Sequence, residues 1–323
     1  MSEAQSRIVV VGISCAVGGA VALSLNDLCI KQLSTGYALH QVILVRGLVG
    51  IAFILGVIQV SGIGFGSLRT ARPWAHLIRA SVVMVSNVTY FLGLAAMPIA
   101  DAAAIGFVAP ILVTLISVLF LGERVGWHRW AAVVMGLIGV IIMLRPEGEF
   151  HWAAVLILIS ALCYATTQNM TRHLRETESS ITINFYTQIA FIVVSVGMGM
   201  WVSDGHLSGS ADASLAFLFR VWIWPPMQDW IFFVGTGVAV AIGGMLMGHA
   251  YRTNPPALIA PFEYTSMPLA VIYGLVFFGT FPDAQGWVGI ALIVGAGLYT
   301  LYRETLRRGG VVSGVAKEAD HAG

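Results

Sequence analysis

Residues 99–144 read IADAAAIGFVAPILVTLISVLFLGERVGWHRWAAVVMGLIGVIIML, and they already indicate the class of fold. This stretch holds two apolar segments, 99–121 and 127–144, with a short polar turn between them. A helix that crosses a membrane needs about 20 mainly apolar residues. The stretch therefore predicts two membrane-spanning helices that are joined by a tight loop.

The composition extends this prediction to the whole chain. Of the 323 residues, 58% are hydrophobic and only 10% are charged, whereas a soluble domain carries about 25% charged residues. This excludes a soluble enzyme and a disordered protein, and a net charge of +1 with no basic stripe argues against a nucleic-acid partner. We expect an all-α polytopic membrane protein. Apolar stretches predict ten spans, at about residues 8–31, 39–60, 74–95, 99–121, 127–144, 152–172, 180–202, 228–250, 256–279 and 284–303.

The positive charges predict the orientation. If the N-terminus lies inside, 13 Lys and Arg residues fall on cytoplasmic segments and only three fall on the opposite side. Such a bias is typical of cytoplasmic loops, so we expect a multi-pass protein of the plasma (inner) membrane with both termini in the cytoplasm. Of the longer connections, 61–73, 145–151 and 203–227, the last is polar and then aromatic, as an interfacial loop would be.

The chain also repeats itself. An offset of 157 residues places Gly122 on Gly279 and Trp130 on Trp287, and a weaker match at an offset of 141 places Lys31 on Arg172. Five spans are thus followed by five similar spans that enter the membrane in the opposite sense. Inverted repeats are typical of transporters that bind substrate between the halves, although channels contain them too and a duplication can persist for packing alone. We expect repeats at 1–146 and 147–308, followed by a disordered cytoplasmic tail at 309–323.

The stretch from Pro110 to Trp127, followed by the glycines of 136–139, resembles the signature of the drug/metabolite transporter superfamily, EamA type. A second copy at 268–279 and 289–297 is similar, except that Thr280 stands where the first copy has Glu123. The resemblance implies a ten-helix bundle with a cavity lined by helices 1, 3, 4, 6, 8 and 9. It also implies secondary active transport or exchange without ATP, and therefore no cofactor.

Two short motifs, 100–102 (Ala-Asp-Ala) and 260–265 (Ala-Pro-Phe-Glu-Tyr-Thr), look like the branch of this family that includes S-adenosylmethionine and riboflavin importers. The family as a whole spans amino acids, nucleotides, sugars, quaternary amines, vitamins and drugs. The resemblance therefore leaves the substrate open, as well as the choice between import and export.

Charged residues inside predicted spans are candidates for substrate binding, because each costs about 2.5–3.5 kcal/mol at a helix centre on insertion scales. Glu263 lies in the ninth span beside Tyr264. A carboxylate next to an aromatic ring suits an organic cation, or a proton. The alternative is a structural ion pair with Arg46 in the second span.

Asn26 and Asp27 lie near the predicted outer end of the first span, at the mouth of the cavity. Lys31 follows Asp27 by four residues, so a local ion pair on the helix surface is the alternative. Arg46 is placed to pair with Asp27 or Glu263, or to bind a substrate carboxylate through its forked guanidinium.

Polar side chains in two other spans could line the cavity or could bond neighbouring helices. They are Asn87 and Tyr90 in the third span, and Tyr164, Gln168 and Asn169 in the sixth. Enzyme motifs such as a Walker loop or His-Glu-x-x-His are absent from the sequence.

The sequence thus predicts a secondary active transporter, not an enzyme, that moves a small cationic or zwitterionic metabolite by alternating access. Protons are a candidate coupling ion, a choice that the sequence leaves open, and the protein is a monomer or homodimer in the lipid bilayer. An exporter of amino acids or drugs is the alternative of the same class. A channel and a membrane-embedded enzyme are the alternatives of other classes.

Overall fold

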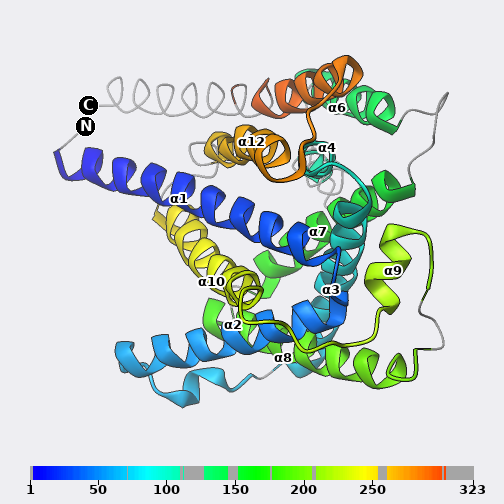
Figure 1. Ribbon diagram of the computed structural model, residues 1–323. Coiled ribbons are helices and arrows are strands. Elements are labelled where there is room, and N and C mark those ends of the chain that lie inside the picture. The colour runs from blue at the N-terminus through cyan, green and yellow to red at the C-terminus, as the bar shows by residue number, and fades with distance from the viewer. Residues whose placement is uncertain are drawn as a thin grey trace, which may run out of the picture.

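The computed structural model describes residues 3–70, 72–109, 112, 127–144, 152–174, 177–205, 209–253, 260–299 and 302, and in these residues every regular element is a helix (Figure 1). The α-helices are α1 (Glu3–Leu33), α2 (Leu39–Ser61), α3 (Pro73–Ala96), α4 (Ile99–Gly106), α6 (Trp127–Leu144), α7 (Trp152–Leu174), α8 (Ser180–Trp201), α9 (Ala213–Phe219), α10 (Trp230–Thr253) and α12 (Ser266–Phe278). Two 3-10 helices, η1 (Phe65–Leu68) and η2 (Ala260–Thr265), and a last helix at Ala284–Tyr299 complete the described elements.

Each predicted span contains a helix. Among the described residues, five helices are long and apolar enough to cross a membrane, and shorter apolar helices occupy four more of the predicted stretches. The protein is therefore a polytopic membrane protein, and the full number of ten crossings stays a prediction. The five long helices are those at 8–33, 39–61, 73–96, 181–201 and 230–250.

Two predicted spans are interrupted. In the span predicted at 99–121, α4 ends at Gly106 and a turn follows at Phe107, while most of the remainder lies outside the described residues. In the span predicted at 256–279, the 3-10 helix η2 precedes α12. Pro268 follows the second break, and proline removes a backbone donor and crowds the preceding turn.

The two ends of the bundle can be told apart by contacts. We call the end where α1 begins the N-side, and the opposite end the far side. On the N-side, Ala16 of α1 packs on Ala250 near the end of α10, and Thr182 near the start of α8 donates to the Ser67 carbonyl (2.6 Å). The chain therefore runs up and down between the two sides.

Helix pairs approach closely where glycine replaces a side chain. α1 packs along α10, α3 along α7, and α2 along α8. A Cβ placed on Gly93 of α3 would lie 2.5 Å from the Ile157 Cγ1 and 2.7 Å from the Ala153 backbone oxygen of α7. Small residues at such crossings let membrane helices pack without a hydrophobic driving force.

The connection at 203–227 was predicted to be an interfacial loop, and the structure forms α9 within it. Hydrogen bonds join this connection to the far-side turn between α1 and α2. The guanidinium of Arg220 donates to the carbonyls of Ser34 (3.0 Å) and Tyr37 (2.8 Å), and the Tyr37 hydroxyl donates to Asp229. Figure 1 shows α9 beside α3. The connection at 145–151 and the predicted tail at 309–323 lie outside the described residues.

Candidate functional site

Six polar side chains from four helices meet inside the bundle, towards its far side. We call them the far-side cluster: Asn26 and Asp27 from α1, Arg46 from α2, Asn87 and Tyr90 from α3, and Thr236 from α10. At a helical rise of 1.5 Å per residue, they lie about 9–14 Å in from the far-side ends of their helices. The cluster is therefore within the apolar part of the bundle.

Asp27 is held by hydrogen bonds to both of its oxygens. Asn26 donates to Oδ1 (3.0 Å) and the Tyr90 hydroxyl donates to Oδ2 (2.9 Å). The side-chain oxygen Oδ1 of Asn26 in turn accepts a hydrogen bond of 2.5 Å from the hydroxyl of Thr236, whose side chain is fully buried. This chain of bonds joins α3, α1 and α10.

Arg46 is 3% exposed and is sandwiched between two rings. Its guanidinium carbon lies 4.8 Å from the centre of the Phe191 ring and 5.2 Å from the Phe91 ring. It donates one side-chain bond, to Asn87 Oδ1 (3.0 Å), and its buried Nε has no partner among the described residues. Because arginine offers five N–H donors, the guanidinium keeps donors for another group.

Asp27 and Arg46 attract each other electrostatically across the cluster. The alternative of a local pair between Asp27 and Lys31 is wrong. Lys31 instead donates to the carbonyls of Leu94 (2.7 Å), Ala95 (3.0 Å) and Met97 (2.8 Å), at the end of α3. The lysine thereby satisfies carbonyls that the end of a helix leaves without partners.

Glu263 and Tyr264 lie elsewhere in the bundle. Their neighbour Phe262 packs against Ala16 of α1, which is 11 residues, or roughly 16 Å of helix, from Asp27. Tyr264 is 8% exposed and packs on Phe107 with ring centres 4.7 Å apart. The ten predicted site residues therefore do not form one group.

The remaining predicted residues lie on α7. Tyr164 is 46% exposed, and the side chains of Gln168 and Asn169 lie outside the described residues. Thr236 was missed by the sequence analysis. Its position, among glycines in an apolar span, could have indicated it, because a hydroxyl is the only side-chain polar group in that part of the span.

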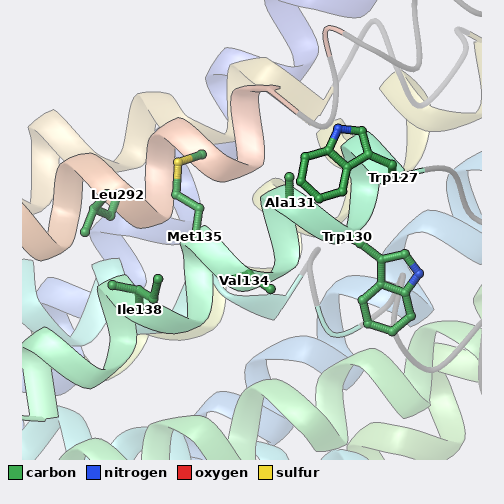
Figure 2. A pocket seen from close by; sticks show the side chains of 7 residues that line it. All are labelled: Trp127, Trp130, Ala131, Val134, Met135, Ile138 and Leu292. Atoms are coloured by element: carbon green, nitrogen blue, oxygen red, sulfur yellow. The ribbon is translucent and has the colours of Figure 1, made fainter.

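An apolar groove of about 320 Å³ lies away from this cluster, along α6 and the last helix. Figure 2 shows Met135 and Leu292 from the two helices, with Trp127 and Trp130 at one end of the groove. None of the six residues of the far-side cluster lines it. A lining of this kind offers apolar contact and little hydrogen bonding, so this groove does not supply the polar contacts that the far-side cluster offers.

Comparisons with known proteins find relatives of this chain among membrane transporters. The model of the EamA-like transporter family matches residues 10–145. A riboflavin transporter of Rhizobium johnstonii is 30% identical over 299 residues, which are 92% of this chain and 93% of that protein. An S-adenosylmethionine uptake transporter of Rickettsia bellii is 24% identical, with 91% and 94% covered. A pseudopaline exporter, CntI, of Pseudomonas aeruginosa is 23% identical, with 88% and 93% covered.

A solved crystal structure shares the fold, with a TM-score of 0.60 and 19% identity over 91% of this chain and 97% of that one. The family match, the transporter relatives and the apolar helices together describe a multi-pass transporter of small metabolites in the bacterial plasma membrane, and not an enzyme. The chain belongs to the EamA-like transporter family, within the drug/metabolite transporter superfamily.

Proposed function

We propose that this protein takes up a small zwitterionic or cationic metabolite by alternating access and binds it at the far-side cluster. The observation that carries the proposal is the gathering of the partly buried Asp27 and the buried Arg46 with amides and hydroxyls from four helices. Ionisable residues inside membrane bundles are costly and mark the pathways of substrates and ions.

The two charges give the site its chemistry. Asp27 faces the positive group of the metabolite, and the adjacent Tyr90 ring adds a surface that favours a cation. Arg46 has unused donors, so it takes a carboxylate in a charge-assisted bond, replacing or sharing its contact with Asn87. Asp27 is also the group we propose as the carrier of a coupled proton.

The helix boundaries support the inverted repeat on which alternating access depends. The starts of α2 and α8, Leu39 and Ser180, are 141 residues apart. The starts of α3 and α10, Pro73 and Trp230, are 157 residues apart. These are the two offsets that the sequence repeat has.

Helix contacts support the same symmetry. If α1 exchanges with α7 and α3 with α10, the contact of α1 with α10 becomes that of α7 with α3, and both contacts exist. The contact of α2 with α8 maps onto itself. Phe107 and Tyr264, which are 157 residues apart, stack on each other between the two interrupted spans. Broken helices at matching positions of two halves point to a transport pathway.

We further propose that the N-side faces the cytoplasm, because Lys and Arg gather there. The far-side cluster is then reached from outside. Glu263 and Tyr264 would contact the metabolite later, on its way to the N-side, and Tyr164, Gln168 and Asn169 stay predictions as lining residues of that pathway.

The test is transport by the pure protein in proteoliposomes. Labelled S-adenosylmethionine, riboflavin, choline and an amino-acid mixture are offered with and without a proton gradient. We expect saturable uptake of one member that carries a positive charge, with accumulation when the gradient is present. Flux without saturation would indicate a channel. Transport only out of preloaded liposomes would indicate an exporter, as CntI is named. Saturable uptake of riboflavin alone would refute the proposal that the metabolite carries a positive charge.

A further inference from the structure

A second group of polar side chains lies inside the bundle, close to the N-side. Arg79 of α3 donates through Nε to the Thr171 hydroxyl of α7 and through Nη1 to the Thr187 hydroxyl of α8, both at 2.9 Å. The two hydroxyls donate to carbonyls of their own helices, at Thr167 and Ile183. They are therefore acceptors for the arginine. We call Arg79, Thr171 and Thr187 the N-side cluster.

Arg79 is not neutralised by an acid within the described part of the chain. The nearby carboxylate of Glu178 is engaged elsewhere, because it accepts a bond of 2.7 Å from Thr70 and lies 3.4 Å from the ring of His76. Hydroxyls satisfy two donors of Arg79 but supply no negative charge. An arginine in this position keeps its charge and several N–H donors for an anion.

Two residues of the N-side cluster stand at positions that the sequence repeat relates to the far-side cluster. At the offset of 141, Arg46 of α2 corresponds to Thr187 of α8. At the offset of 157, Arg79 of α3 corresponds to Thr236 of α10. At these two pairs of positions, an arginine in one half corresponds to a threonine in the other, so the two residue types have changed places between the halves.

The two clusters differ in their acid. Asp27 accompanies Arg46 in the far-side cluster, and Gln168 stands at the corresponding sequence position in the second half. The first cluster thus offers both charges, and the second offers only the positive one. The difference makes the far-side cluster suited to a zwitterion, and the N-side cluster suited to an anionic group.

We propose that Arg79, oriented by Thr171 and Thr187, forms a second binding site that holds a carboxylate on the N-side of the protein. It lies about 5–10 Å in from the helix ends on that side. The inference rests on the proposed function in one respect, because the carboxylate is that of the transported metabolite. It leaves Arg46 and binds Arg79 when the two halves change their relative orientation.

The site can be tested without knowing the metabolite. Membrane vesicles of both orientations are treated with 4-hydroxyphenylglyoxal, which modifies arginine, with and without sodium benzoate, and the modified peptides are quantified by mass spectrometry. Arg72, which is exposed at the start of α3, reports which vesicles present the N-side to the medium. We expect benzoate to slow the modification of Arg79 in those vesicles by the factor 1 + [benzoate]/Kd, about tenfold at ten times Kd. The modification of Arg72 should not change.

Two variants separate an anion site from a merely accessible arginine. Thr187→Ala removes a hydroxyl that orients Arg79, so the protection by benzoate should weaken severalfold. Thr89→Ala is the matched control, because this partly exposed hydroxyl of α3 donates to carbonyls of its own helix. If Arg79 is modified equally with and without benzoate, or stays unmodified where Arg72 reacts, the inference is overturned.

The outcome is independent of the transport assay. Protection of Arg79 in protein that shows no saturable uptake would leave the anion site in place and remove its role in transport. Saturable uptake without any protection would leave the proposed function in place and remove the N-side site.

Discussion

Replacing Gly93 by alanine is expected to force α3 and α7 apart. The new Cβ would lie 2.5 Å from Ile157 Cγ1 and 2.7 Å from the Ala153 backbone oxygen. Carbon atoms in contact prefer about 3.5–4.0 Å, so the gap must open by about 1 Å. The carbonyl oxygen belongs to the backbone of α7, so it cannot move unless the helix shifts. Overpacking of this kind costs about 1–3 kcal/mol.

The thermal unfolding midpoint in detergent measures this cost. At about 2–4 °C per kcal/mol, Gly93→Ala should unfold about 2–12 °C below the wild type. Gly244→Ala is the matched control, since a Cβ there meets nothing within 4 Å, and it should keep or raise the midpoint because alanine is the better helix former. If Gly93→Ala unfolds at or above the wild-type midpoint, the close approach of α3 and α7 is wrong.

Three further substitutions probe the far side and one helix start. Lys31→Met removes the donor for three carbonyls at the end of α3 and should cost about 2 kcal/mol or more of unfolding free energy, while exposed Gln32→Met should cost little. Burial and the Asp229 carboxylate raise the pKa of Tyr37 from 10.0 to about 12, so its stabilisation is complete below pH 10 and is lost as the pH rises to 12. The difference in unfolding midpoint between Tyr37→Phe and wild type should vanish over that range. Ser179→Ala removes the cap that accepts from the Thr182 amide (3.1 Å) and should cost about 1 kcal/mol by chemical denaturation.

Helix positions followed from the sequence because lipid permits few alternatives. A chain in hydrocarbon must satisfy its backbone groups within each helix, so an apolar stretch fixes both the element and its approximate ends. The ends of α3 at Pro73 and Ala96 lie within one residue of the span predicted at 74–95. The break at Phe107 was missed, because hydropathy does not change where the backbone hydrogen bonding does.

The candidate site was predicted only in part. Asp27 and Arg46 stood out because a charge in an apolar span needs a reason, and the structure brings them together. Their partners depend on how helices rotate about their axes, which one sequence does not specify. Lys31 shares a helix face with Asp27 by spacing, yet tertiary packing turns it to the end of α3. Thr236 gave little signal, because a single hydroxyl costs little in a helix.

The central claim is that Asp27 and Arg46 bind the metabolite, and the most direct measurement is the KM of saturable uptake from the far side. The variants are Asp27→Asn and Arg46→Gln, each confirmed as folded, and the control is Arg72→Gln on the exposed start of α3. Loss of one charge-assisted bond, about 1.5–3 kcal/mol, predicts that each variant raises KM by about tenfold or more while the control does not. Wild-type KM and rate in both variants would contradict the account.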